Sequence, residues 1–106
     1  MSYKVLSSET ELNEVLEKDS FLLFKHSLTC PVSADAKEEF EKFTSDNTIP
    51  AYMIHVQESR ELSNQVAEHY DIKHESPQLF YVKDGAVKYH NSHWHIKYDT
   101  LKDVVK

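Results

Sequence analysis

The sequence predicts an α/β fold in which helices cover both faces of a central mixed sheet. Apolar runs of strand length alternate with amphipathic helical segments in the first two thirds of the chain. Two further strand-like runs are joined by the short turn Lys83-Asp84-Gly85. Alternation calls for parallel strands with right-handed crossovers, whereas the turn adds a C-terminal antiparallel hairpin. We therefore expect parallel strands, a hairpin at one edge and helices on both sides.

The first two elements are a short strand and a capped helix. Residues 3–6 alternate in polarity, as a half-buried strand does. Ser8 is followed three residues later by Glu11, which is the pattern of a capping box at a helix start. The inward positions of this helix follow core spacing and are Leu12, Val15 and Leu16.

The next two elements bring the chain to its central strand and a longer helix. Residues 21–24, Phe-Leu-Leu-Phe, form a continuous apolar run that is typical of a strand buried on both faces. From Pro31 the spacing becomes helical, and this helix is expected to fray over residues 44–48. Its inward side chains are Ala36, Phe40 and Phe43.

The second half of the chain adds a strand, a helix, the hairpin and a last helix. Residues 51–56 indicate another buried strand, and Ser59 is expected to cap the helix that follows. The hairpin strands are expected at residues 78–82 and 86–90, and a helix at residues 96–105. The inward positions of the two helices are Leu62, Val66, Tyr70, Leu101, Val104 and Val105.

Composition favours one domain over residues 1–106. With 40% hydrophobic residues, the 106-residue chain can build a single core, and one glycine with three prolines argues against disorder. A net charge of −6 makes a nucleic-acid partner unexpected, because phosphates attract clustered Lys and Arg. No apolar run has the length of a signal peptide or a membrane span, so we expect a cytoplasmic location and no membrane partner.

Cys30 is the single cysteine of the chain and is followed at once by Pro31. Backbone amides at a helix start lack partners and carry partial positive charge, which favours a thiolate over a thiol. Proline suits the first helical position, where no N–H is needed. We therefore predict a reactive thiol where the second strand ends, the edge at which α/β sheets place their sites. The alternative is a buried cysteine that acts as a small hydrophobe.

Four polar side chains near the thiol are candidates for supporting roles. Ser33 either donates a hydrogen bond to the thiolate or is an exposed helix residue. Lys25 and His26 alternate onto opposite faces, so at most one of them is expected to face the thiol loop. Thr29 either supplies a hydroxyl or shapes the turn.

Histidines cluster late in the chain, at His90, His93 and His95 beside Trp94. On a strand His93 and His95 would share a face while His90 would not, and zinc ligands must converge on one point. We therefore expect no metal site and no tightly bound cofactor.

Two motifs together resemble the thioredoxin superfamily over essentially the whole chain. Cys30-Pro31-Val32-Ser33 follows the second strand, and Ser76-Pro77 directly precedes the strand at 78–82. The resemblance implies a thioredoxin-like fold and a cis Ser76–Pro77 bond. It also implies a loop that offers the backbone of Ser76 to an extended substrate.

Three runs look more specifically like the monothiol bacilliredoxin family (YtxJ-type, BrxC-like). They are residues 29–33, Phe24-Lys25-His26-Ser27 and His93-Trp94-His95-Ile96. This resemblance implies a cytosolic bacterial protein that uses bacillithiol, a low-molecular-weight thiol, as a cosubstrate. Trp94 is then either a packing residue or a wall of the groove for that thiol.

The resemblance also implies a mechanism, because Ser33 stands where dithiol relatives carry a resolving cysteine. Cys30 would take bacillithiol from an S-bacillithiolated protein by thiol exchange, and a second bacillithiol, another redoxin or a reductase would restore it. Two alternatives stay open. One is a non-catalytic peptide-binding module with Cys30 as a redox sensor, and the other is a glutaredoxin-like iron–sulfur carrier.

Overall fold

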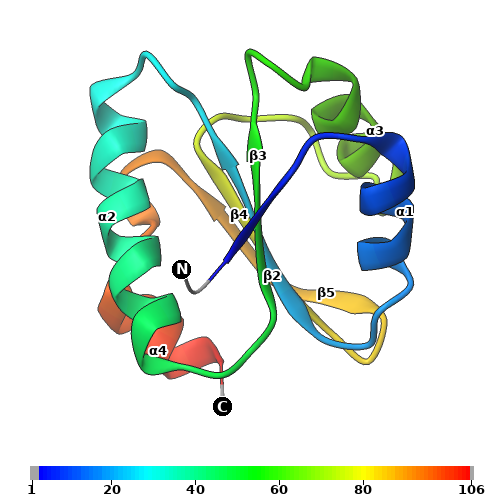
Figure 1. The fold of residues 1–106 in the computed structure, drawn as a ribbon. Helices are drawn as coiled ribbons and strands as arrows, with labels where there is room; N and C mark the ends of the chain where they lie inside the picture. The colour runs from blue at the N-terminus through cyan, green and yellow to red at the C-terminus, as the bar shows by residue number, and fades with distance from the viewer. Residues whose placement is uncertain (1–2, 106) are drawn as a thin grey trace.

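A five-stranded mixed sheet crosses the middle of the molecule in the order β1-β3-β2-β4-β5 (Figure 1). The structure is a computed structural model and describes residues 3–105. The strands are β1 (Lys4–Leu6), β2 (Phe21–His26), β3 (Ala51–His55), β4 (Gln78–Lys83) and β5 (Ala86–Ser92). The helices are α1 (Glu9–Leu16), α2 (Pro31–Asp46), α3 (Arg60–Tyr70) and α4 (Tyr98–Val104), with a short 3₁₀ helix η1 (His93–His95).

The strand pairing confirms the expected mixed sheet. β1 and β2 both run parallel to β3, whereas β4 pairs antiparallel with β2 and carries β5 at the edge. β2 is therefore the central strand, and all six of its residues are buried. At the hairpin turn Asp84 and Gly85 have φ values of 56° and 77°, a backbone region that glycine enters without steric cost. The turn predicted at residues 83–85 is thus present.

The helices lie on both faces of the sheet, two to a side (Figure 1). Alternation along β2 divides the core: Leu22 and Phe24 pack with α2 and α4, whereas Phe21 and Leu23 pack with α1 and α3. The predicted inward residues of the long helix, Ala36, Phe40 and Phe43, are all buried on the first side. Leu12, Val15, Leu62 and Val66 are buried on the second, with Leu16 and Tyr70 partly buried against them.

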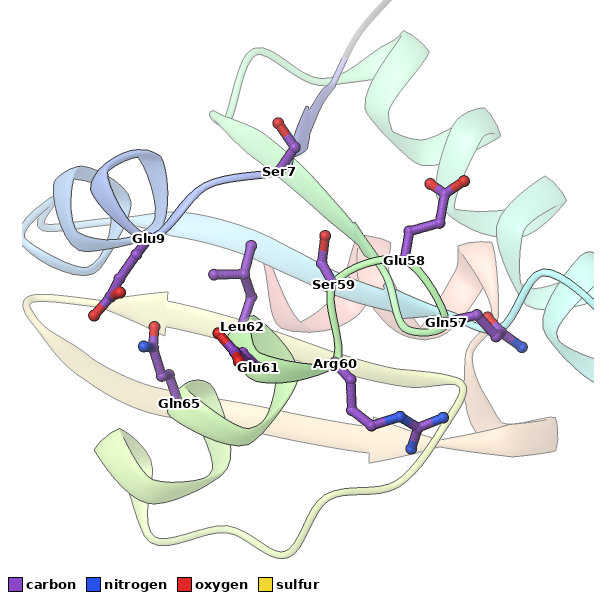
Figure 2. A pocket seen from close by; sticks show the side chains of 9 residues that line it. All are labelled: Ser7, Glu9, Gln57, Glu58, Ser59, Arg60, Glu61, Leu62 and Gln65. Atoms are coloured by element: carbon purple, nitrogen blue, oxygen red, sulfur yellow. The ribbon is translucent and has the colours of Figure 1, made fainter.

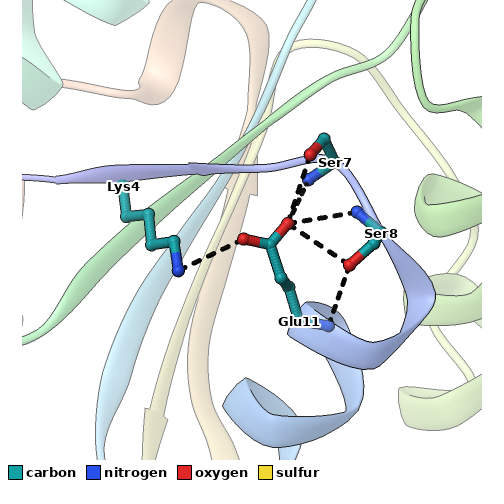
Figure 3. A network of polar contacts seen from close by, with 4 residues as sticks. All are labelled: Lys4, Ser7, Ser8 and Glu11. Atoms are coloured by element: carbon teal, nitrogen blue, oxygen red, sulfur yellow. Dashed lines mark hydrogen bonds and ion pairs between the residues drawn. The ribbon is translucent and has the colours of Figure 1, made fainter.

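The start of α1 carries the predicted capping box (Figure 3). Glu11 N–H donates to Ser8 Oγ over 3.2 Å, and Glu11 Oε1 accepts from Ser8 N–H at 3.2 Å and from Ser7 N–H at 2.9 Å. Lys4 Nζ lies 3.2 Å from the other carboxylate oxygen. The Ser7 backbone bond, followed by the Lys4 bond, lowers the pKa of Glu11 to about 2. This helix start is held by its own side chains.

Three details differ from the sequence-based expectations. The last helix is shorter than residues 96–105, because Ile96 and Lys97 are extended and α4 spans Tyr98–Val104. Ser59 stands at the N-cap of α3 but makes no side-chain cap hydrogen bond. β2 ends at His26, so Cys30 lies beyond the strand on a connecting loop.

No helix within residues 3–105 combines the length and the apolar character needed to cross a membrane.

Candidate thiol site

The segments that hold the predicted site residues meet at one edge of the sheet. β2 and β3 are parallel, so both end at this edge, and α2 begins just beyond β2. β4 starts here as well, because Gln78 pairs with Lys25 in β2 and with Ser92 in β5. The loop before β4 and the turn after β5 therefore lie beside the loop that carries Cys30, as the rule for α/β sites predicts.

Cys30 is partly exposed and occupies the N-cap position of α2. Its carbonyl accepts from Ala34 N–H at 3.1 Å, which closes the first turn of the helix, and its own N–H donates to Ser27 O over 3.5 Å. Pro31 follows at the first helical position, as predicted. No side chain caps this helix and no acidic residue stands in its first turn. The partial positive charge of the first-turn amides is thus not neutralised by a capping side chain, and it lies at the helix end that carries Cys30.

Ser33 is fully buried, at 0% exposure, so the alternative of an exposed helix residue is wrong. Its Oγ accepts from Ser27 N–H at 2.8 Å and lies 2.8 Å from Nδ1 of His26. Helical spacing puts Ser33 in phase with Ala36 and Phe40 on the inner face, and that spacing was a signal for its burial. Ser33 ties the start of α2 to the end of β2.

His26 lies under the thiol loop and is neutral at cellular pH. Its ring stacks on Phe24, with centroids 5.8 Å apart, and is almost fully buried. Burial, followed by the charge of Lys37, lowers its pKa to about 4. When the neutral ring carries its proton on Nε2, Nδ1 accepts the single hydroxyl proton of Ser33. In that arrangement Ser33 has no proton left for the thiolate.

Lys25 points to the opposite face from His26, as alternation predicts. Its Nζ lies 3.1 Å from Nδ1 of His74 and 5.4 Å from the centre of the Phe80 ring. Burial lowers the pKa of Lys25 to about 8, and that of His74 is lowered as well, first by its own burial. These contacts join Lys25 to the loop before β4. An effect of Lys25 on Cys30 stays a prediction.

The loop before β4 contains the expected cis bond between Ser76 and Pro77. Ser76 Oγ is buried and has no hydrogen-bond partner among residues 3–105. Pro77 O accepts from His93 N–H, so η1 is attached directly to this loop. The resemblance to the thioredoxin superfamily places an extended substrate along this backbone, and that role stays a prediction.

Two exposed apolar side chains flank this edge. Trp94, in η1, is 66% exposed, so the packing alternative for this residue is wrong. Leu28 is 45% exposed and precedes Cys30 by two residues. Thr29 lies between Leu28 and Cys30 in the chain, and its Oγ1 accepts from the side-chain amide of Gln57 over 3.3 Å. The loop thus presents an exposed apolar side chain two residues before Cys30.

Comparison with known proteins agrees with this geometry. The family description "Monothiol bacilliredoxin BrxC" matches residues 4–101. The chain belongs to the monothiol bacilliredoxin family. The family match and the related thioredoxin-fold structure support a thiol oxidoreductase activity for the chain.

The solved structures show the same fold. A thioredoxin-fold protein proposed to be an oxidoreductase has a TM-score of 0.91 at 34% identity, over 99% of this chain and 95% of its own. Oxidised thioredoxin O2 from Arabidopsis thaliana has 0.77 at 21% identity, over 97% and 90%. A mutant thioredoxin from Halobacterium salinarum has 0.75 at 19% identity, over 98% and 88%. The prediction of a thioredoxin-like fold is confirmed.

In this bacilliredoxin-family chain a hollow of about 370 Å³ lies between the start of α1 and the start of α3 (Figure 2). Cys30 does not line it. Three glutamates and one arginine surround it, so its charge does not suit an anionic ligand: Glu9, Glu58, Glu61 and Arg60. Gln57, at one end, is the lining residue that also reaches the thiol loop.

Sequence reasoning missed Gln57 and His74. Gln57 comes two residues after β3, at the carboxyl edge of the sheet, and that position was an available signal. His74 lies in the loop before β4 and meets Lys25 only through the fold. Among residues 3–105, His, Cys, Asp and Glu form no group of three that could hold a metal ion.

Proposed function

We propose that this protein removes bacillithiol from S-bacillithiolated cytoplasmic proteins by thiol exchange through Cys30. The observation that carries the proposal is a single partly exposed cysteine at an uncapped helix start, with buried Ser33 where a resolving cysteine would stand. Membership of the monothiol bacilliredoxin family supports bacillithiol as the thiol cosubstrate.

In the first step the Cys30 thiolate attacks the bacillithiol sulfur of the mixed disulfide. A new disulfide forms between Cys30 and bacillithiol, the bond to the protein substrate breaks, and the substrate sulfur leaves as a thiolate that takes a proton from solvent. The partial positive charge of the first turn of α2 stabilises the attacking thiolate. No electrons are gained or lost overall, because one disulfide replaces another.

In the second step the thiolate of a second bacillithiol attacks the bacillithiol sulfur held on Cys30. Bacillithiol disulfide is released and Cys30 returns as a thiolate. The chain has no second cysteine for an internal disulfide, so an external thiol, or another redoxin or reductase, must complete the cycle.

The protein substrate lies along the edge that the loops form. The backbone of Ser76 pairs with an extended segment of the substrate, as the superfamily resemblance implies. Leu28 and Trp94 supply exposed apolar contacts for the substrate on the same edge. Thr29 and Pro31 set the path of the chain on either side of Cys30.

The test uses a protein carrying one S-bacillithiolated cysteine, excess bacillithiol and the purified enzyme. We expect release of the free substrate thiol at a rate that Cys30→Ala reduces to the uncatalysed level. Parallel reactions with glutathionylated and coenzyme A-modified substrates and the matching thiols measure selectivity, and we expect bacillithiol to be fastest.

Two results would contradict the proposal. Release that is unchanged in Cys30→Ala would leave the peptide-binding module with a sensor cysteine as the better description. A coloured product after anaerobic reconstitution with iron and sulfide, combined with no release of substrate thiol, would favour the iron–sulfur carrier.

A further inference from the structure

Gln57 makes three hydrogen bonds to the segment that leads into Cys30. Its Oε1 accepts from Leu28 N–H at 2.9 Å, and its Nε2 donates to Ser27 Oγ over 2.9 Å and to Thr29 Oγ1 over 3.3 Å. One side chain thus contacts three consecutive residues directly before the cysteine. Figure 2 shows Gln57 turned away from the rest of the hollow, toward the segment that enters α2.

Strand register explains why Gln57 reaches this segment. β2 and β3 are parallel, with His26 opposite His55. Val56 N–H donates to His26 O over 2.9 Å, which continues the pairing one residue beyond β3. Two residues past the paired histidines, Gln57 lies beside Leu28. The contact therefore follows from the central pairing of the sheet.

The three bonds also fix the orientation of the amide group. Leu28 N–H needs an acceptor, so Oε1 must face it, and Nε2 then faces the two hydroxyl oxygens. A flipped amide would place Nε2, which is a donor, against the Leu28 N–H, which is also a donor. Both amide hydrogens and the amide oxygen of Gln57 are thereby used on the thiol loop.

The loop is also bonded to Ser33, in the first turn of α2. Ser27 N–H donates to Ser33 Oγ within the buried pair that Ser33 forms with His26. Ser27 is thus bonded to Ser33 through its backbone and to Gln57 through its hydroxyl. Between Ser27 and Cys30, the contacts of Leu28 and Thr29 with Gln57 hold the loop against the end of β3.

We propose that Gln57 is a positioning residue that holds residues 27–29 so that the Cys30 sulfur stays at the start of α2. The inference rests on the proposed function where it concerns turnover, and it stands apart from it where it concerns the reactivity of Cys30 alone. If Gln57 no longer holds the loop, the Cys30 sulfur can move away from the helix start. It then loses the stabilisation that the partial positive charge of the first turn provides. Small displacements of a reacting atom are costly in rate.

The test compares Gln57→Met, Gln57→Glu and a control, Gln65→Met, in the purified protein. Methionine keeps the length of the side chain without the bonds, and glutamate keeps the acceptor for Leu28 N–H but loses both donors. Gln65, in α3, lines the same hollow, so Gln65→Met is the control for replacing a glutamine of the hollow with methionine. Thermal unfolding of each variant establishes that it is folded.

The first readout is the rate of alkylation of Cys30 against pH, which needs no bacillithiol. We expect a loss of about two- to fivefold at pH 7 in Gln57→Met, because the sulfur leaves the favourable charge of the first turn. Gln57→Glu should be slower still at low salt and approach Gln57→Met as salt screens the added charge. Gln65→Met should match the wild type. Identical profiles for Gln57→Met and the wild type would overturn the inference.

The second readout is turnover of the S-bacillithiolated protein. We expect Gln57→Met to lose kcat at nearly unchanged KM, because the reacting sulfur is displaced and the substrate contacts remain. If the wild type shows no turnover while alkylation still depends on Gln57, the proposed function fails and the positioning role stands. A folded Gln57→Met that keeps wild-type kcat overturns the positioning role even if the wild type is active.

Discussion

The two helices that flank β2 begin in opposite ways. α1 starts at Ser8, where the Glu11 carboxylate accepts backbone bonds and gives the helix its own negative charge (Figure 3). α2 starts at Cys30, with proline next, no side-chain cap and no acid in the first turn. The positive end of α1 is neutralised within the protein, whereas that of α2 is left for the sulfur.

The N-terminal ends of α1 and α2 are also anchored differently. The capping box of α1 lies at the surface and depends on an ionised Glu11. α2 is held from beneath by fully buried Ser33, which bonds to Ser27 and His26. A helix end can therefore be anchored without a cap when a buried side chain in its first turn supplies the bond. The cap position is then free for a reactive group.

The largest expected effect comes from titrating His26. Its pKa is about 4 in the folded protein against 6.5 for a free histidine, so the unfolded chain binds the proton first as pH falls. The contribution of neutral His26 to the free energy of unfolding is therefore fully present above pH 6.5 and is lost as the pH falls below it. Between pH 7.5 and 4.5 this contribution declines by about 2.5 kcal/mol. Urea unfolding at a series of pH values measures this decline.

His26→Asn keeps an acceptor near the position of Nδ1 but cannot titrate. His74, whose pKa is also lowered, weakens the fold in the same direction and is present in both proteins, so the difference between them isolates His26. The control His69→Asn removes an exposed histidine and should decline as the wild type does. An equal decline in His26→Asn and the wild type would refute the buried anchor.

The next largest effect is expected from Ser33→Ala. The change leaves Ser27 N–H and His26 Nδ1 without their partner, and we expect a loss of about 2 kcal/mol in the free energy of unfolding. Denaturant unfolding at pH 7.5 measures it. Ser45→Ala, on an exposed position of the same helix, provides the matched control. A loss no larger than in that control would mean that Ser33 does not anchor α2.

Removing the cap of α1 should cost less. For Ser8→Ala we expect a loss of about 1 kcal/mol in the free energy of unfolding, as for other N-cap serines. The alkylation rate of Cys30 should stay at the wild-type value, because α1 packs on the other face of the sheet. Slower alkylation of Cys30 in this variant would show that the two helix starts are coupled and not anchored independently.

The smallest effect comes from adding a second negative charge near the start of α2, where Asp35 already follows the first turn. Ala34 is exposed in the first turns of α2, and Ala34→Glu should slow alkylation of Cys30 at pH 7 by about two- to fivefold. The effect should shrink in high salt. Ser45→Glu adds the same charge at the far end of the helix and should leave the rate unchanged. Equal slowing in both variants would mean that total charge is responsible, and not its place at the helix start.

Features that depend on residues close together in the chain could be predicted from the sequence. The capping box needs only Ser8 and Glu11 three positions apart, and the hairpin turn needs Asp84-Gly85, which accept positive φ. The order of strands and helices follows from side-chain periodicity, because a strand alternates and a helix repeats every 3.6 residues. Cys30 at the start of a helix belongs to the same class of local pattern.

The side-chain contacts across the edge of the sheet could not be predicted from the sequence and became visible in the fold. Gln57 reaches residues 27–29 because β3 pairs with β2, and Lys25 reaches His74 because β4 pairs on the other side. Trp94 is exposed in η1, whose first residue His93 donates its backbone N–H to Pro77 O. Such contacts join residues far apart in the chain. Local periodicity carries no information about them, since they depend on strand order and register.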